Sequence, residues 1–308
     1  MKNKVSIIGC GNVGTTTAGF IAQAGISDVV LFDILEGMPQ GKALDLSEAC
    51  PLWGSASSIK GTNNYQDTKD SDIVVITAGL ARKPGMSRDD LLFANAKIIK
   101  EVAVRVSRLS PEAVIIAVTN PMDAMAYLAW KTSGFPHKRV IGMGGVLDSS
   151  RLRTFTAWNL GVSPSDIEAM VIGSHGDEML PLMRFTTLKG VPVTELIKRS
   201  EIDAIKERTK KAGAEIVGLL KIGSAYYSPA QSAFEMIKAI LLDEKRLLPC
   251  SCYLNGEYGV RGIYVGVPAI IGKEGVEKVI ELKLDDPEIE EFKSSIASVR
   301  AMIEKLNI

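Results

Sequence analysis

The chain of 308 residues is 46% hydrophobic, which is enough to bury a large core and to form about two domains. Its 36 basic and 36 acidic residues cancel, so no overall positive field favours nucleic acid or anionic lipid. We therefore expect neither a nucleic-acid nor a membrane partner, and an anionic small molecule would need a local positive site.

The four cysteines show none of the C-x-x-C spacing that is typical of metal or redox sites. We expect free, reduced thiols at Cys10, Cys50, Cys250 and Cys252, as in a cytoplasmic protein. The first residues carry no signal-peptide pattern, and no apolar run reaches the roughly 20 residues that span a bilayer. Cytoplasmic localisation is therefore expected.

The first half of the chain alternates short apolar runs with longer amphipathic segments. The apolar runs lack the polar alternation of a half-exposed strand, so each predicts a strand buried on both faces. Expected strands cover residues 5–8, 29–32, 73–77 and 114–118, and expected helices cover 13–24, 38–49 and 90–109. This order predicts βαβ units and an α/β fold with a doubly wound parallel sheet.

The second half has a different pattern, which is typical of an α+β domain with a mixed sheet. Helices are expected at 147–160, 201–220, 226–242 and from Pro287 onward, strands at 167–172, 247–253 and 262–271, and a hairpin around 188–191. The pattern changes at a glycine-rich stretch, residues 142–145. We therefore predict one domain of residues 1–143 and a second of residues 144–308.

A glycine-rich motif joins the first predicted strand to the first predicted helix. Gly9, Gly11 and Gly14, with Asn12 and Val13 between the last two, form G-x-G-x-x-G. In this context the first glycine permits a tight turn, and the second lets a pyrophosphate approach the backbone. The third allows close helix–strand packing, and the helix N-terminus attracts phosphate. The motif predicts a Rossmann dinucleotide-binding half, which by itself names no reaction.

An acid at the end of the next strand indicates which dinucleotide is bound. Asp33 falls about 20 residues after the last glycine, where an acid accepts hydrogen bonds from the adenosine ribose. The same charge repels the 2′-phosphate of NADP, and Ile34 offers no cation to offset that repulsion. NAD is therefore the expected cofactor. The alternative for Asp33 is a helix cap that follows the strand.

An arginine-bearing loop follows the third predicted strand. Residues 78–88 carry Arg82 and Arg88 on either side of a Pro-Gly pair. The loop leaves the sheet at the edge where open α/β sheets bind their ligands, which is typical of a loop that closes on an anion. A single isolated loop arginine would be better interpreted as solvated surface charge.

Two further motifs combine polar side chains with turns or helices. Residues 118–121 read Val-Thr-Asn-Pro at another strand end, where Asn120 can present an amide to a ligand and Pro121 can fix the turn through a cis bond. Asp148 and Arg151 are three residues apart, so they share one face of a helix. They either pair with each other or serve a site that needs both charges.

His175 lies between small residues in Gly-Ser-His-Gly-Asp, just past a predicted strand. A lone histidine is more often structural than catalytic, but the flanking glycines deny this one a packed environment of its own. His137, the other histidine, lies in a polar turn and is not a candidate. No metal site is predicted.

Together these motifs resemble the lactate/malate dehydrogenase family, and the resemblance runs through essentially the whole chain. The ordered set of glycine motif, aspartate, arginine loop, T-N-P, L-D-x-x-R and G-x-H-G-D is highly specific. The resemblance implies a Rossmann domain followed by a substrate domain, NAD as cofactor and reversible hydride transfer to a small 2-keto acid. It also implies a homo-oligomer, commonly a tetramer and sometimes a dimer.

The resemblance implies a role for each motif residue. His175 would exchange a proton with the substrate oxygen, with Asp148 holding its tautomer and stabilising its charged form. Arg88 would polarise the carbonyl, and Arg151 would bind the substrate carboxylate. Asn120 would orient the substrate. The implied cofactor contacts are Gly9, Gly11, Asn12, Val13, Gly14, Asp33, Asn95, Val118 and Asn120.

One loop position chiefly separates the substrates within this family, with glutamine in lactate enzymes and arginine in malate enzymes. Here the position is Arg82, followed by Lys83, a second cation of unassigned effect. Oxaloacetate carries a second carboxylate, and a buried unpaired charge costs about 3–5 kcal/mol, or roughly 10²–10⁴-fold. Ala225 resembles the small residue that makes room for it. Malate dehydrogenase activity, a reaction of the tricarboxylic acid cycle, is thus implied.

Three alternatives remain beside this interpretation. A lactate or broad 2-hydroxyacid dehydrogenase would turn over pyruvate as well as oxaloacetate. An NAD-dependent glycosidase would need a divalent metal held by a cysteine and a histidine, and no cysteine accompanies His175. A non-catalytic NAD-binding descendant should have lost at least one motif residue, yet Arg82, Arg88, Asn120, Asp148, Arg151 and His175 are all present.

Overall fold

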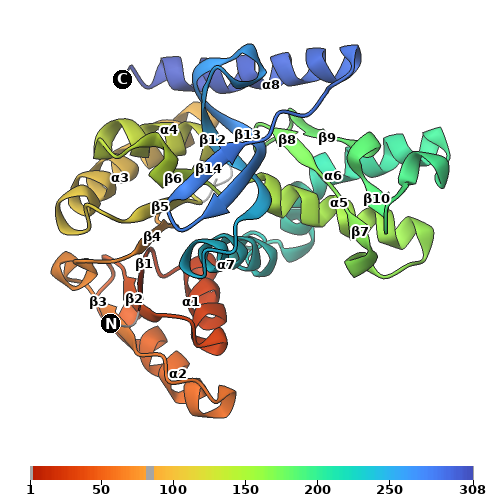
Figure 1. The fold of residues 1–308 in the computed structure, drawn as a ribbon. Helices are drawn as coiled ribbons and strands as arrows, with labels where there is room; N and C mark the ends of the chain where they lie inside the picture. Colours follow the sequence, from red (N-terminus) through yellow and green to blue (C-terminus); the bar gives the residue numbers. More distant parts are fainter. Residues whose placement is uncertain (1–2, 81–86, 308) are drawn as a thin grey trace.

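The computed structural model describes residues 3–80 and 87–307, and its first six strands form a parallel sheet (Figure 1). The sheet order is β3-β2-β1-β4-β5-β6. The strands are β1 (Lys4–Ile8), β2 (Asp28–Phe32), β3 (Ile59–Thr62), β4 (Ile73–Ile76), β5 (Val114–Ala117) and β6 (Val140–Gly142). The order reverses between β1 and β4, which is where such sheets bind their ligands. The prediction of a doubly wound sheet is confirmed.

Helices cover both faces of this sheet. They are α1 (Asn12–Ala24), α2 (Met38–Trp53), α3 (Arg88–Leu109), α4 (Met122–Ser133) and, from the second half, α7 (Tyr227–Leu241). Successive strand residues point to opposite faces. Ile7 and Val75 therefore lie in the apolar cluster completed by α1 and α7, whereas Ile8 and Ile76 lie in the cluster completed by α3 and α4. Burial of both faces explains why these strands read as continuous apolar runs.

The second half extends the same sheet with antiparallel strands. From β6 the order continues β12-β13-β8-β9, and β14 also pairs with β13. These strands are β8 (Val171–Gly173), β9 (Met179–Pro181), β12 (Arg246–Asn255), β13 (Arg261–Gly272) and β14 (Gly275–Val279). The remaining helices are α5 (Gly145–Leu160), α6 (Arg199–Leu220) and α8 (Asp286–Lys305). The predicted α+β second half is confirmed, and the predicted boundary after residue 143 falls between β6 and α5.

A separate small sheet contains the predicted hairpin. It has the order β11-β10-β7, with β7 (Ile167–Glu168), β10 (Thr187–Leu188) and β11 (Val191–Pro192). The prediction of one strand over residues 167–172 is wrong, because β7 belongs to this small sheet and β8 belongs to the large one. The chain changes sheets at residues 169–170, between β7 and β8.

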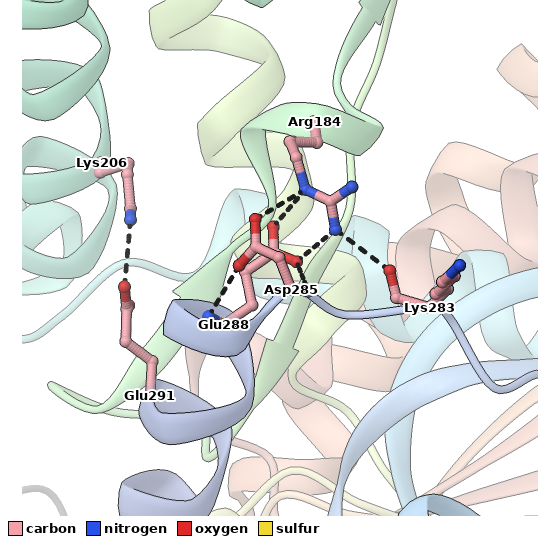
Figure 2. A network of polar contacts seen from close by, with 6 residues as sticks. All are labelled: Arg184, Lys206, Lys283, Asp285, Glu288 and Glu291. Carbon is pink, nitrogen blue, oxygen red and sulfur yellow. Dashed lines mark hydrogen bonds and ion pairs between the residues drawn. The ribbon is translucent and has the colours of Figure 1, made fainter.

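Ion pairs connect the C-terminal helix α8 to other elements of the second half (Figure 2). Arg184, on the 3-10 helix Met183–Phe185, donates from Nε to Glu288 over 3.1 Å and from Nη2 to the carbonyl of Lys283 over 3.1 Å. Lys206 of α6 lies 3.4 Å from Glu291 of α8.

None of the helices in the described ranges is long and apolar enough to cross a membrane.

Candidate active site

The turn between β1 and α1 is shaped by glycines. Gly9 has a φ of +110°, and a Cβ there would lie 2.6 Å from the main-chain nitrogen of Ala78. A Cβ at Gly14 would clash with the carbonyl oxygen of Gly9 and lie 2.8 Å from Thr77 Oγ1. At Gly11 a Cβ would have no described atom within 4 Å. Close packing thus requires the first and third glycines, whereas the second borders open space at a helix N-terminus, which suits a pyrophosphate.

Asp33 lies at the end of β2 beside this turn. Its Oδ2 accepts a hydrogen bond from the main-chain nitrogen of Cys10 over 2.7 Å, and its Oδ1 accepts one from Leu35 over 3.0 Å. The N-cap of α2 is Gly37, so the alternative that Asp33 caps this helix is wrong. Each carboxylate oxygen has a second lone pair, which leaves capacity for ribose hydroxyls.

All four cysteines are free and buried, as expected. Burial, together with the nearby charge of Asp33, raises the pKa of the Cys10 thiol to about 12. The thiol therefore stays protonated at neutral pH, and Cys10 serves in the glycine turn as a small, uncharged residue. Its own main-chain carbonyl accepts a hydrogen bond from Lys42 Nζ over 2.6 Å, which places a cation beside the turn.

Asn95 of α3 connects the turns that follow β4 and β5. It is fully buried, and its Oδ1 accepts from the nitrogen of Leu80 over 2.7 Å while its Nδ2 donates to the carbonyl of Asn120 over 2.7 Å. Its amide thus holds main chain, and its direct cofactor contact stays a prediction. Val118 directly follows β5, and its main-chain nitrogen donates to the carbonyl of Ile76 over 2.9 Å. The Asn120–Pro121 bond is cis, and Asn120 is exposed at this edge of the sheet.

The structure brings the predicted proton-transfer pair together. His175 lies between β8 and β9, and its Nδ1 is 2.8 Å from Oδ2 of Asp148 on α5. The other oxygen of Asp148 is 3.2 Å from Nη1 of Arg151, one turn along the same helix. Only 2% of the Asp148 side chain is exposed, compared with 13% for each of its two partners. One buried carboxylate therefore pairs with Arg151 and also with His175; that Asp148 and Arg151 serve a substrate site stays a prediction.

This arrangement favours the charged form of His175. Burial opposes the charge, but the negative charge of Asp148 and its hydrogen bond outweigh that penalty, so the pKa of the ring is raised above its ordinary value. Because Nδ1 faces the carboxylate, it carries a proton in the neutral ring as well. Nε2 is thus the nitrogen that gains and loses the proton.

Arg151 supplies the local positive charge that an anionic substrate would need. Its Nε is buried and has no hydrogen-bond partner among the described residues. Gly213 of α6 faces the same guanidinium, since a Cβ there would lie 3.6 Å from Arg151 Nη2. The side chain as a whole is 13% exposed, so a guanidinium suited to bind a carboxylate is held largely out of water.

Arg88 reaches the loop that carries His175. It is the first residue of α3, after the capping residue Ser87, and its guanidinium pairs with Asp177 over 2.5 Å. Both side chains are more than two-thirds exposed. Asp177 was not singled out from the sequence, although it stands two residues after His175 in the same motif. Arg82 and Lys83 lie outside the described residues, and Ala225 lies between α6 and α7.

Asp123 is a second buried carboxylate that sequence reasoning missed. It lies in the first turn of α4 with 2% of its surface exposed. Its Oδ2 accepts a hydrogen bond from the main-chain nitrogen of His175 over 2.8 Å, and its Oδ1 accepts one from Ser251 Oγ over 2.6 Å. Burial raises the pKa of Asp123, and these two bonds oppose that shift. An acid within Met-Asp-Ala-Met-Ala was a visible signal, because an unpaired carboxylate is rarely buried.

Comparison with known proteins agrees with this geometry. The model of the lactate/malate dehydrogenase NAD-binding domain matches residues 3–142, and that of the α/β C-terminal domain of the same family matches residues 145–307. The chain is 55% identical to a malate dehydrogenase from Roseiflexus sp. (strain RS-1), over 98% of this chain and 100% of the relative.

Solved structures of malate dehydrogenases and of lactate dehydrogenases both superpose on the chain. A malate dehydrogenase from Cryptosporidium parvum has a TM-score of 0.98 at 47% identity, covering 100% of this chain and 99% of its own. A lactate dehydrogenase from the same organism, complexed with lactic acid and nicotinamide adenine dinucleotide, has a TM-score of 0.97 at 44% identity, covering 100% and 98%. The chain belongs to the lactate/malate dehydrogenase family.

Proposed function

We propose that the protein is an NAD-dependent oxidoreductase that interconverts malate and oxaloacetate. The observation that carries the proposal is the single buried carboxylate of Asp148 shared by His175 and Arg151. It places a proton donor and a carboxylate-binding cation side by side, at the end of the sheet from which a dinucleotide-binding turn also projects. The relatives that are more than half identical over the full chain carry the same activity in their names.

The described residues fit the cofactor. The open space beside Gly11 and the N-terminus of α1 suit the pyrophosphate, and Asp33 suits the adenosine ribose. The nearby acid also favours NAD over NADP. When bound, the reduced cofactor supplies the hydride for the keto carbon of the substrate.

The protein's own residues bind the substrate and move the proton. Arg151 binds the substrate carboxylate through its guanidinium, which fixes the keto group relative to His175. His175 gives its Nε2 proton to the keto oxygen during reduction and takes it back during oxidation. Asp148 stabilises the charged ring before that transfer. Arg88 contributes positive charge for the developing oxyanion.

The first experiment measures NADH consumption with oxaloacetate and with pyruvate in parallel, and repeats both with NADPH. We expect oxaloacetate with NADH to give by far the highest kcat/KM. The second candidate is lactate dehydrogenase activity, because a lactate dehydrogenase of similar fold superposes almost as well as the malate enzyme. Preferred turnover of pyruvate would establish that candidate, and turnover of neither substrate would refute the proposed function.

The choice of malate rests on Arg82, a sequence argument outside the described residues. Replacing Arg82→Gln should lower kcat/KM for oxaloacetate by roughly 10²–10⁴-fold, since the second carboxylate would lose its counter-charge. Pyruvate turnover should hold or rise. Lys83→Gln is the matched control, because it removes the neighbouring cation and leaves Arg82 in place. An equal loss on both substrates in Arg82→Gln would contradict its role in discrimination.

We further propose that the protein works in the cytoplasm as a homo-oligomer, a tetramer or a dimer, in the tricarboxylic acid cycle. Large apolar side chains on the surface support an assembly: Leu52 of α2 and Ile222, just after α6, are each 88% exposed. Sedimentation at several protein concentrations tests the assembly. A monomer at every concentration would contradict it.

A further inference from the structure

The buried carboxylate of Asp123 has no part in the proton transfer described above, yet it contacts the residue that performs it. Asp123 begins α4, three residues after Asn120, and accepts hydrogen bonds from His175 and from Ser251 on β12. It therefore joins three distant segments: His175 lies 52 residues from Asp123 along the chain, and Ser251 lies 128 residues from it. A charged group is excluded from water at such a position only where its bonds are well made.

The bond from Asp123 reaches the main chain of His175, and the ring bonds to a different carboxylate. The ring is oriented by Asp148, whereas the amide is held by Asp123 at 2.8 Å. The preceding amide, Ser174 N–H, donates to Ser295 Oγ of α8 over 2.6 Å. In the loop between β8 and β9, these two bonds fix main-chain amides, whereas the side chains of His175 and Asp177 bond to Asp148 and Arg88.

Of the two bonds, only the one to Asp123 holds the main-chain amide of His175 itself, the residue whose ring transfers the proton. A displacement of about 1 Å in a catalytic group can cost roughly 100-fold in rate. Holding the main chain of His175 is thus a requirement of the chemistry as well as of the fold.

We propose that Asp123 is a positioning residue, which fixes the main chain of His175 so that the ring stays between Asp148 and the substrate. The inference rests on the proposed function and deepens it. The residue acts through His175 and touches neither substrate nor cofactor. The hydrogen-bond acceptor that faces the amide is the feature that matters, and the link to Ser251 is secondary.

The test compares Asp123→Ala, Asp123→Asn and Ser251→Ala. The alanine variant removes the acceptor, and we expect kcat to fall 30- to 100-fold while the dissociation constant of NADH, measured by fluorescence, stays within twofold. The asparagine variant keeps an oxygen for the His175 amide and an amino group that can donate to Ser251, so kcat should stay within about fivefold. Ser251→Ala leaves the His175 contact intact and should keep kcat within twofold.

Three results would overturn the proposal. They are a kcat for Asp123→Ala within twofold of the parent, a parallel loss of NADH binding and kcat, or a loss in Ser251→Ala as large as in Asp123→Ala. If the alanine variant does not fold, Asp123→Ser replaces it, since its hydroxyl keeps a polar group near Ser251 but is too short for the His175 amide. A kcat for that variant close to the parent's would equally refute the idea.

A readout that does not need turnover separates this inference from the proposed function. The chain has two histidines, so the NMR titration of the His175 ring is resolved and is assigned with a His137→Gln variant. Because the charge of Asp123 itself raises the pKa of His175, Asp123→Asn should lower that pKa, and Asp123→Ala or Asp123→Ser should lower it further as the ring leaves Asp148. An equal pKa of His175 in all three variants would overturn the positioning role even if the parent protein turned over neither keto acid.

Discussion

Two carboxylate networks in this protein differ mainly in their access to water. In the network of Figure 2, Arg184 is 45% exposed and Asp285 is 46% exposed, and only Glu288, at 12%, is largely shielded. Around His175, the carboxylates of Asp123 and Asp148 are each 2% exposed. Water screens the exposed pairs of the first network, so these pairs contribute little to stability. In the second network the same chemical groups shift pKa values and fix geometry, because little solvent competes with them.

Removing the ring at the centre of the buried network should give the largest effect. We expect His175→Asn to lower kcat for oxaloacetate reduction by about 10³-fold or more, since the ring that supplies the proton is removed. NADH affinity should stay within twofold. The matched control is His137→Asn, which alters an exposed histidine and should leave both quantities unchanged. Loss of NADH binding in His175→Asn would make the residue structural.

Neutralising the shared carboxylate should have the next largest effect. Asp148→Asn keeps the volume but removes the charge that orients His175 and pairs with Arg151. A charge-assisted hydrogen bond contributes about 1.5–3 kcal/mol, so kcat should fall roughly 10- to 100-fold. Steady-state kinetics should also show a higher KM for oxaloacetate, because Arg151 loses its partner. A KM that stays constant would indicate that Arg151 is held by other contacts.

The raised pKa of His175 predicts opposite pH profiles for the two directions. Reduction needs the protonated ring, so its kcat/KM should fall tenfold per pH unit once pH exceeds a midpoint above about 6.5. Oxidation needs the neutral ring and should rise through the same midpoint. Asp148→Asn should move the midpoint down, since the charge that raises the pKa is gone. A midpoint at or below 6.5 in the parent protein would contradict the electrostatic assignment.

The smallest effect is expected in the surface network. A double-mutant cycle of Lys206→Met and Glu291→Gln measures the coupling of a pair whose atoms lie 3.4 Å apart. We expect a coupling of about 0.5 kcal/mol or less in the free energy of unfolding, and a kcat equal to the parent's. The coupling should shrink further in 1 M salt. A salt-insensitive coupling above about 2 kcal/mol would place this pair with the buried networks.

The hydrophobic pattern of the sequence predicted much of the fold, but some helices and strands lack such a pattern. The segment that forms α4 was not predicted, because nearly every residue from Met122 to Ala129 is buried and an amphipathic period is therefore absent. Strand β3 reads Ile-Lys-Gly-Thr and so shows no apolar run, and β6 has only three residues. The division of residues 167–172 between β7 and β8 depends on pairing partners far away in the sequence, which no local pattern reveals.

The site was predictable wherever a motif carried the chemistry. The glycine turn, Asp33, Asp148, Arg151 and His175 stand in recognisable sequence contexts, and the structure groups them as two adjoining clusters. The contacts that hold those residues were not predictable in the same way. Asp123 meets His175 across 52 positions, and Asn95 meets Asn120 across 25, so both pairings exist only after the sheet has formed.

One continuous sheet runs from β3 to β9 and contains strands from both halves of the chain. Ser251 of β12 pairs with Gly142 of β6, and a Cβ on Gly142 would lie 2.8 Å from that of Ser251. A chain cut between residues 143 and 144 would expose β6 on one fragment and β12 on the other as unpaired edges, which recruit further strands and aggregate. The two halves matched by the family models therefore share one sheet, and we expect neither to be stable when produced alone.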